Sequence, residues 1–155
     1  MADSALHKVW DSLVTALEAI RSDDGYHHTV ATVTPDLVSL MALPAPRTPA
    51  LMVLHDGETS LRTFRLGSYV EDRFAFLVEG RIDAPGLTSG EKAGAYADLV
   101  ADLERAVTRD PTRGGVANHT YVRGTRGPYC GLDAGGMVLF QARLEVIVVR
   151  EVGES

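Results

Sequence analysis

Apolar residues recur every three or four positions from Leu6 to Ile20, which predicts an amphipathic helix with one buried face. Ser4 or Asp3 can cap the start of this helix, because both side chains accept hydrogen bonds from free backbone amides. The segment 22–25 (SDDG) has the composition of a turn and is expected to end the helix.

A second helix is predicted from the cap residue Thr88 to Val107. Glu91 follows Thr88 by three residues, which is the spacing of a capping box at a helix N-terminus. The apolar stripe of this helix consists of Tyr96, Leu99, Val100, Leu103 and Val107. We expect this stripe to pack on a β-sheet.

Alternating or continuous apolar residues between and after the helices predict β-strands. Asp56-Gly57 is a strong hairpin signal between two of them. The last strand is the longest, and its mixed outer face suggests that one side is partly wet or lies at an interface. The predicted strands are 26–34, 50–55, 61–66, 74–83, 118–123 and 137–151.

Two segments have the composition of irregular connections. Residues 35–49 contain four prolines, so we expect an ordered but irregular connection with a short strand or helical turn around Leu37–Met41. Residues 124–136 (GTRGPYCGLDAGG) contain five glycines and a proline, which predicts a long turn or mobile loop.

The order of these elements indicates an α+β domain with an antiparallel or mixed sheet and the helices on one face. A two-domain chain with residues 35–49 as the linker is the competing interpretation. We reject it because fewer than 50 residues precede the linker, too few for an independent core without disulfides or metals. Residues 1–155 are therefore predicted to form one domain.

Composition and charge exclude several classes of function. The 21 acidic and 15 basic side chains give a net charge of −6. Because an acidic surface repels the phosphate backbone, we do not expect sequence-specific DNA binding. No apolar run approaches the ~18 residues that span a bilayer, and the N-terminus does not have the pattern of a signal peptide. We therefore expect a cytoplasmic protein without a membrane partner. The single cysteine, Cys130, excludes an internal disulfide.

The histidines and carboxylates do not form a recognisable catalytic or metal-binding motif. His27 and His28 are adjacent, so on a regular strand they point to opposite faces and cannot share one metal ion. Asp56 is interpreted as a turn residue, and Glu79 and Asp83 as solvated residues at a strand end. We therefore predict no catalytic residue, no metal and no cofactor.

The glycine-rich segment contains two further candidates. Cys130 would need a nearby base such as His119 to become a nucleophile, and a passive cysteine is the favoured interpretation. The glycines do not follow the spacing of a phosphate-binding loop. Arg113, Arg123 and Arg126 concentrate positive charge near this segment, either as a solvated face or as a site for a partner's carboxylates or phosphates.

The order and length of the elements carry a resemblance to a known family. The helix Leu6–Ile20 leads into a first strand, and a proline-rich connection ends in the strand after Pro49. The strand 74–83, the helix around 99–107 and a glycine-broken hairpin with the long strand 138–149 follow. In this layout the chain resembles the tail terminator proteins of tailed bacteriophages, also called tail completion or neck proteins.

The resemblance implies a structural virion protein without enzymatic activity. Copies would form a homo-oligomeric ring, expected to be hexameric, that ends the tail tube and joins the tail to the head. Its partners would be the tail tube protein and the head–tail connector proteins, and DNA would pass through without sequence-specific binding. The protein would be found in the tail or neck of the virion, and in the host cytoplasm during assembly.

The contacts between ring subunits, or those with the tube or the connector, are expected in the segments 43–49 and 124–136. The interaction residues that we single out are Arg113, Arg123, Arg126, Tyr129 and Asp133. One alternative is the neighbouring head–tail connector or stopper protein. The alternative from another class is a small α+β enzyme or ligand-binding domain that uses His27, Asp56 or the Cys130 loop, which a pocket with converging polar groups would favour.

Overall fold

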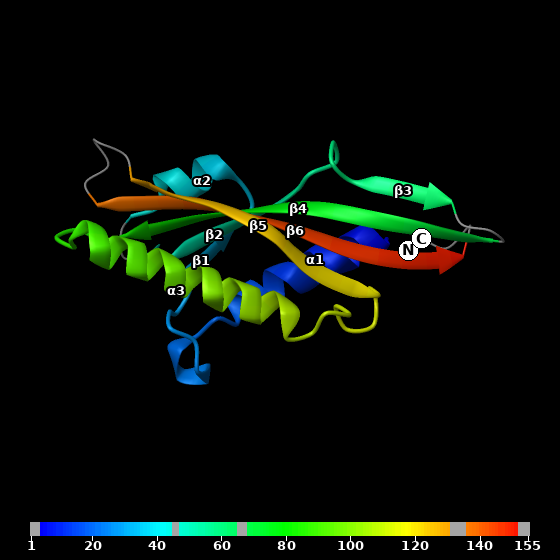
Figure 1. The fold of residues 1–155 in the computed structure, drawn as a ribbon, viewed down its shortest axis with the longest axis horizontal. Coiled ribbons are helices and arrows are strands. Elements are labelled where there is room, and N and C mark those ends of the chain that lie inside the picture. The colour runs from blue at the N-terminus through cyan, green and yellow to red at the C-terminus, as the bar shows by residue number, and fades with distance from the viewer. Residues whose placement is uncertain (1–3, 45–46, 65–67, 131–135, 152–155) are drawn as a thin grey trace.

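The computed structural model describes residues 4–44, 47–64, 68–130 and 136–151 (Figure 1). They form an α+β fold around a six-stranded sheet, as the sequence predicts. In chain order the elements are α1 (Ala5–Glu18), the 3-10 helix η1 (Ser22–Asp24), β1 (Thr32–Thr34), α2 (Leu37–Ala42), β2 (Ala50–His55), β3 (Leu61–Phe64), β4 (Tyr69–Asp83), α3 (Ser89–Thr108), β5 (His119–Cys130) and β6 (Met137–Glu151).

The sheet is mixed and has the strand order β1-β2-β4-β6-β5, while β3 pairs with a further part of β4. β1 and β2 run parallel, and the other neighbouring strands are antiparallel. β4 and β6 form the centre and pair without interruption from Tyr69 opposite Glu151 to Asp83 opposite Met137. β4 therefore begins before the predicted start at Phe74.

The two long helices begin at the caps that the sequence predicts. The Ser4 hydroxyl oxygen accepts a hydrogen bond from the His7 amide at 3.2 Å. Thr88 and Glu91 exchange both hydrogen bonds of the capping box, at 3.2 and 3.1 Å. The apolar stripes of both helices lie in the main core, where Leu13, Leu17, Leu99, Leu103 and Val107 are fully buried.

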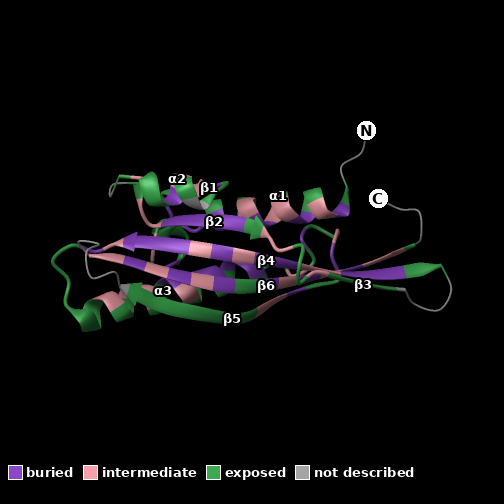
Figure 2. Ribbon diagram, turned by 90° about the horizontal axis from the view of Figure 1, so that it is seen from above, coloured by how far each residue is buried: buried purple, intermediate pink, exposed green. Residues whose placement is uncertain are grey.

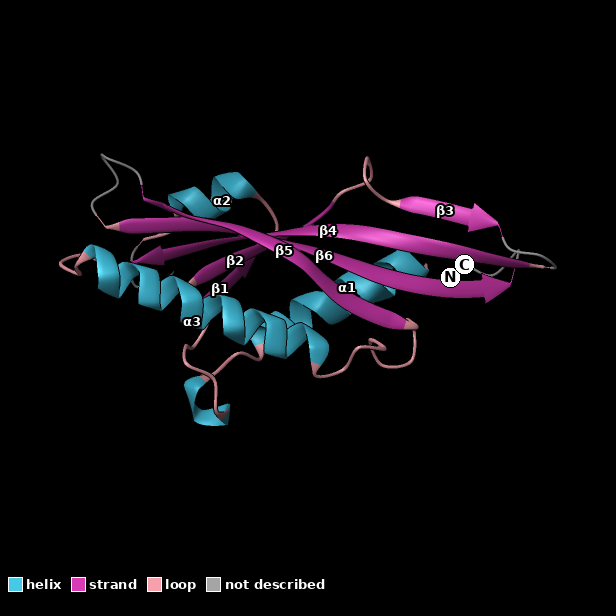
Figure 3. Cartoon of the chain, in the orientation of Figure 1, coloured by secondary structure: helices cyan, strands magenta, loops and turns pink. Residues whose placement is uncertain are grey.

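The helices do not all lie on one face, contrary to the expectation from the sequence. α1 and α3 pack on the face formed by residues such as Val53 and Phe76. α2 packs on the other face, where Leu40 forms a small second core with Ala50 and Met52. Alternate residues of a strand point to opposite faces, so the apolar run of β2 serves both cores. Figure 3 shows α2 above the sheet and α3 below it.

Arg81 fixes α2 to this second face. It is 5% exposed and lies on β4. Its Nη1 donates hydrogen bonds to the carbonyl oxygens of Leu40, Met41 and Leu43, at 2.7–3.0 Å. Its Nε and Nη2 bind both carboxylate oxygens of Asp83, at 2.9 and 2.8 Å. One buried cation therefore satisfies the C-terminal carbonyls of α2, which otherwise have no intrahelical donors.

Two predicted boundaries are wrong for identifiable reasons. Of the predicted strand 26–34, only Thr32–Thr34 is a strand, because the amides of His27 and His28 bond to the Asp102 side chain instead of a strand. Residues 124–130 of the predicted loop belong to β5, whose pairing with β6 shifts register twice. β-bulges absorb glycine and proline within a strand. Residues 131–135 lie outside the described part of the chain.

Burial falls from the centre of the sheet to its edge at β5. Figure 2 shows buried residues along β2 and β4 and mostly exposed residues along β5. Among the described residues, no helix is both long enough and apolar enough to cross a membrane.

Candidate functional site

The histidines that the sequence singles out each have a separate structural partner. His27 Nδ1 lies 2.9 Å from Asp102 Oδ1, and His28 Nε2 lies 3.1 Å from the carbonyl oxygen of Ala95. Within the part of the chain that the structure describes, His, Cys, Asp and Glu nowhere gather in a group of three or more that could hold a metal ion.

The candidate carboxylates are also part of local structure. The Asp56 carboxylate accepts a hydrogen bond from the Thr59 hydroxyl at 2.7 Å, and this bond is the main reason that the pKa of Asp56 is lowered. Glu79 accepts a hydrogen bond from Gln141 Nε2 at 2.9 Å. In the described residues Glu79 makes no hydrogen bond to a hydroxyl or thiol group, and the Thr59 hydroxyl bonded to Asp56 belongs to the same turn.

His119 and Cys130 lie at opposite ends of β5. At about 3.3 Å per residue, their backbones are roughly 35 Å apart along the strand. His119 instead stacks on Tyr121, with 4.2 Å between the ring centroids. The pairing of His119 with Cys130 as base and nucleophile is therefore excluded by geometry.

The surface feature that distinguishes this fold is the sheet face opposite α1 and α3. α2 covers only the part of this face over β1, β2 and the nearby end of β4. The remaining part, which we call the open face, carries residues that alternate with the buried core positions of β4, β5 and β6. Tyr129 of β5 and Arg143 of β6 on this face are exposed, and so is Leu54 near the end of β2, opposite Leu77 of β4.

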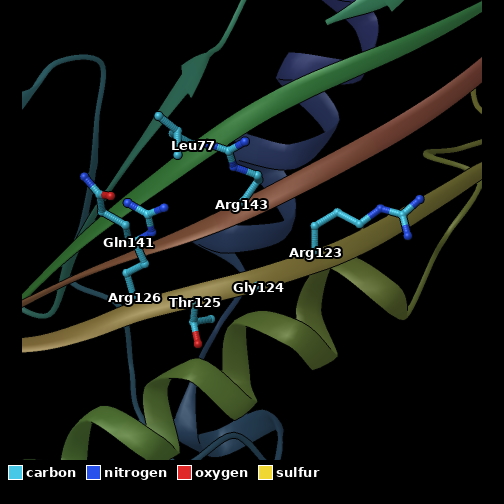
Figure 4. Close-up of a pocket in the computed structure, with 7 residues that line it drawn as sticks. All are labelled: Leu77, Arg123, Gly124, Thr125, Arg126, Gln141 and Arg143. Atoms are coloured by element: carbon cyan, nitrogen blue, oxygen red, sulfur yellow. The ribbon is translucent and has the colours of Figure 1, made fainter. Parts of the chain in front are cut away.

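A hollow of about 320 Å³ lies on the open face between β4, β6 and β5 (Figure 4). We call it the arginine hollow. Strand register builds it, because Arg143 stands opposite both Leu77 of β4 and Gly124 of β5, and Arg126 stands opposite Gln141. The residues that line it are Leu77, Arg123, Gly124, Thr125, Arg126, Gln141 and Arg143.

The first arginine of the hollow is held by its neighbours. Arg123 lies at the register shift between Val122 and Gly124. Its guanidinium donates to Glu145 at 2.8 Å and lies 4.3 Å from the centre of the Tyr121 ring. In Figure 4 this side chain points away from the others along β5. Its charge is therefore largely balanced within the chain.

The other two arginines have no such partner. Neither Arg126 nor Arg143 makes a hydrogen bond or ion pair with an acidic side chain among the described residues, and both are exposed. Arg143 lies near enough to Asp56 to add a minor contribution to the lowering of its pKa. Figure 4 shows Leu77, Gln141, Arg126 and Arg143 close together on one side of the strands. The residues that line the hollow include three arginines and no acidic side chain.

Exposed apolar side chains lie on the same side of the sheet as the arginine hollow. Tyr129 is 51% exposed and lines an adjoining hollow of about 160 Å³ with Leu40, Leu139 and Gln141. On the outside of α2, Val38 is 79% and Met41 44% exposed. Arginine, tyrosine and methionine beside exposed aliphatic residues are typical of the centre of a protein–protein interface.

The structure brings three of the five predicted interaction residues to one face. Arg123 and Arg126 line the arginine hollow, and Tyr129 lies beside it. Asp133 lies outside the described residues. Sequence reasoning missed Arg143 and Gln141, although their positions between core residues of β6 already indicated that they face away from the core.

Arg113 lies elsewhere. It is 2% exposed and donates hydrogen bonds to the carbonyl oxygens of Val107 and Asp110 at the C-terminal end of α3. Burial lowers its pKa, and nearby Asp110 partly opposes this effect. Its Nε and Nη1 have no hydrogen-bond partner among the described residues. Arg113 therefore stabilises a helix end and is not presented to a partner.

Comparison of the chain with models of protein families and with curated proteins gave no match.

Proposed function

We propose that this protein is a structural subunit of a phage tail, which forms a ring at the head-proximal end of the tail and ends growth of the tube. In this role it joins the tail to the connector proteins of the head. The basis for naming a tail terminator is the resemblance in the order of elements. The neighbouring connector or stopper protein remains the alternative within the virion.

The single observation that carries a binding role is the open face. A sheet face that the described helices leave uncovered presents the guanidinium groups of Arg126 and Arg143, which have no acidic partner among the described residues. Exposed Tyr129 and Leu54 lie nearby. Large apolar side chains gathered on a face of a folded protein favour association with another protein. A ring subunit needs such a face, and it needs no catalytic group.

A small-molecule site is supported less well. Ligand pockets bury most of the ligand's surface and are lined mainly by apolar groups. The arginine hollow is partly open to solvent, and its principal side chains are arginine and glutamine. These features suit the edge of a macromolecular partner better than an enclosed metabolite.

The proposal is tested by light scattering after size-exclusion chromatography, combined with negative-stain microscopy. We expect a ring of several copies, or a monomer that assembles into rings when purified tail tubes are added. Tubes capped by the protein should stop adding tube subunits. A protein that stays monomeric at high concentration and leaves tube growth unchanged would refute the proposal, and binding to isolated head connectors alone would favour the connector alternative.

A further inference from the structure

We infer that the arginine hollow of one copy receives the acidic turn at Asp23 and Asp24 of the next copy. This inference rests on the proposed ring and identifies the contact between its subunits. It assigns to each copy a basic socket on the open face and an acidic projection on the opposite side of the molecule.

The socket holds positive charge that no ion pair within the described residues balances. Arg126 and Arg143 extend from adjacent strands toward the same hollow, and neither has an acidic partner in the described residues. Two guanidinium groups brought together in this way repel one another. A carboxylate between them would remove that repulsion, and the planar guanidinium forms two parallel hydrogen bonds to a carboxylate. An anionic group is therefore the expected occupant.

The projection carries the complementary charge. Residues 21–25 are all exposed, and Asp23 and Asp24 are consecutive within η1. Among the described residues, neither carboxylate makes a hydrogen bond or ion pair. The two exposed carboxylates equal the two guanidinium groups of the socket in number and are opposite to them in sign.

The turn is held in place before any contact forms. Arg105 Nη1 donates to the carbonyl oxygen of Gly25 at 2.7 Å, and the Ser22 amide donates to Thr29 Oγ1 at 2.9 Å. Just after the turn, the buried Asp102 accepts the amides of His27 and His28 at 2.9 and 2.8 Å. A preorganised segment loses less conformational entropy on binding than a flexible one.

The positions of socket and projection fit a ring rather than a symmetric pair. The hollow opens on the α2 side of the sheet, whereas η1, blue in Figure 1, projects below α3 on the other side. A contact between two different patches of identical subunits is heterologous, and it closes into a ring when the rotation permits. Tyr129 beside the socket, and Val38 and Met41 of α2 on the same side of the sheet, provide exposed apolar area that two ion pairs alone do not supply.

A charge exchange tests the contact. One variant combines Asp23→Arg and Asp24→Arg, and the other combines Arg126→Glu and Arg143→Glu. Each variant alone should lose the ring-sized species at a concentration at which the wild type is assembled. Mixed in equal amounts, they should form rings again, because each reversed projection then meets a reversed socket and each native projection meets a native socket.

The matched control is Lys8→Glu combined with Lys92→Glu, which changes the net charge by the same amount as the socket variant. Thermal melting should show that every variant remains folded. Rings that persist in either single-patch variant, or a mixture that fails to reassemble, would overturn the contact while leaving the proposed ring intact. Absence of rings in the wild type, with and without tubes, would count against the proposed function itself.

Disulfide trapping tests the contact even where rings are unstable. In a Cys130→Ser background, a copy with Asp24→Cys is mixed with a copy with Arg126→Cys and oxidised. We expect a covalent dimer between the two variants and much less product when Glu18→Cys on α1 replaces Asp24→Cys. Equal trapping by the two would overturn the inference. A titration in which inorganic phosphate occupies the arginine hollow and ring assembly stays unchanged would also overturn the inference.

Discussion

Replacement of Asp102 by alanine should both destabilise the protein and release its acidic turn. Asp102 lies on α3 and is 1% exposed. Its carboxylate accepts the amides of His27 and His28 and lies 2.9 Å from the His27 ring nitrogen Nδ1. Removal of the side chain therefore separates the segment after η1 from the helix that holds it.

The size of the effect follows from these contacts. A hydrogen bond to a charged group contributes about 1.5–3 kcal/mol net, so the two amide bonds together set an upper range of roughly 3–6 kcal/mol. His27 is exposed and His28 half-buried, so water replaces part of what is lost. We expect a loss of about 2–4 kcal/mol in the free energy of unfolding. Asp102→Asn keeps one acceptor oxygen and should lose about half as much.

Urea denaturation measures the loss, and hydrogen exchange locates it. The amides of His27 and His28 should exchange much faster in the alanine variant, whereas those of β4 and β6 should change only with global stability. Asp98→Asn is the matched control, because Asp98 is an exposed acid on the same helix and makes no hydrogen bond or ion pair within the described residues. A loss below about 1 kcal/mol for Asp102→Ala, with unchanged exchange at these two amides, would refute the reasoning.

Three further changes test other parts of the structure. Gly80→Ala places a methyl group 2.1 Å from Phe140 Cε1 and should lower the free energy of unfolding, measured in urea, by about 1–3 kcal/mol. Phe140→Leu should then cost less in the Gly80→Ala background than in the wild type. If the costs of the two changes simply add, there is no clash. Arg81→Ala leaves the partly buried Asp83 carboxylate without this cation and the C-terminal carbonyls of α2 without their donor. It should cost about 3–5 kcal/mol, with faster hydrogen exchange in α2 but not in α1. Asp56 and Asp110 have pKa values below the ordinary 3.8, mainly because each accepts a threonine hydroxyl hydrogen bond. Their contribution to stability is thus present above pH 3.8 and is lost as pH falls through the lower folded values, so the double change to asparagine should flatten the acid part of the stability profile measured by circular dichroism.

The helices could be predicted from the sequence because their signals are local. The capping box at Thr88 and the stripes of three- and four-residue spacing determine both position and buried face, and the structure confirms them. The central strands β4 and β6 could also be predicted, because the alternation of apolar and polar residues along a strand is visible in the local sequence. The α+β class follows from the order of these elements.

The features that define the candidate site depend on distant residues. β5 contains glycines and a proline, and only its pairing with β6 through two register shifts makes residues 124–130 a strand. The place of α2 depends on Arg81, which is far from it in sequence. Arg126 and Arg143 come together through register, which a single sequence does not reveal. Residues 26–31 do not form a strand, because the amides of His27 and His28 donate to the Asp102 carboxylate instead of to a neighbouring strand.

The pairing of β4 with β6 also bears on how the chain folds. Its paired residues are between 54 positions apart (Asp83 with Met137) and 82 positions apart (Tyr69 with Glu151). Loop closure over such separations costs entropy before any ladder bond forms, so domains dominated by non-local pairing fold in milliseconds to seconds. Until β6 docks, one edge of β4 stays available for mispairing with other chains. Dilution or a chaperone during refolding should therefore raise the yield of folded protein.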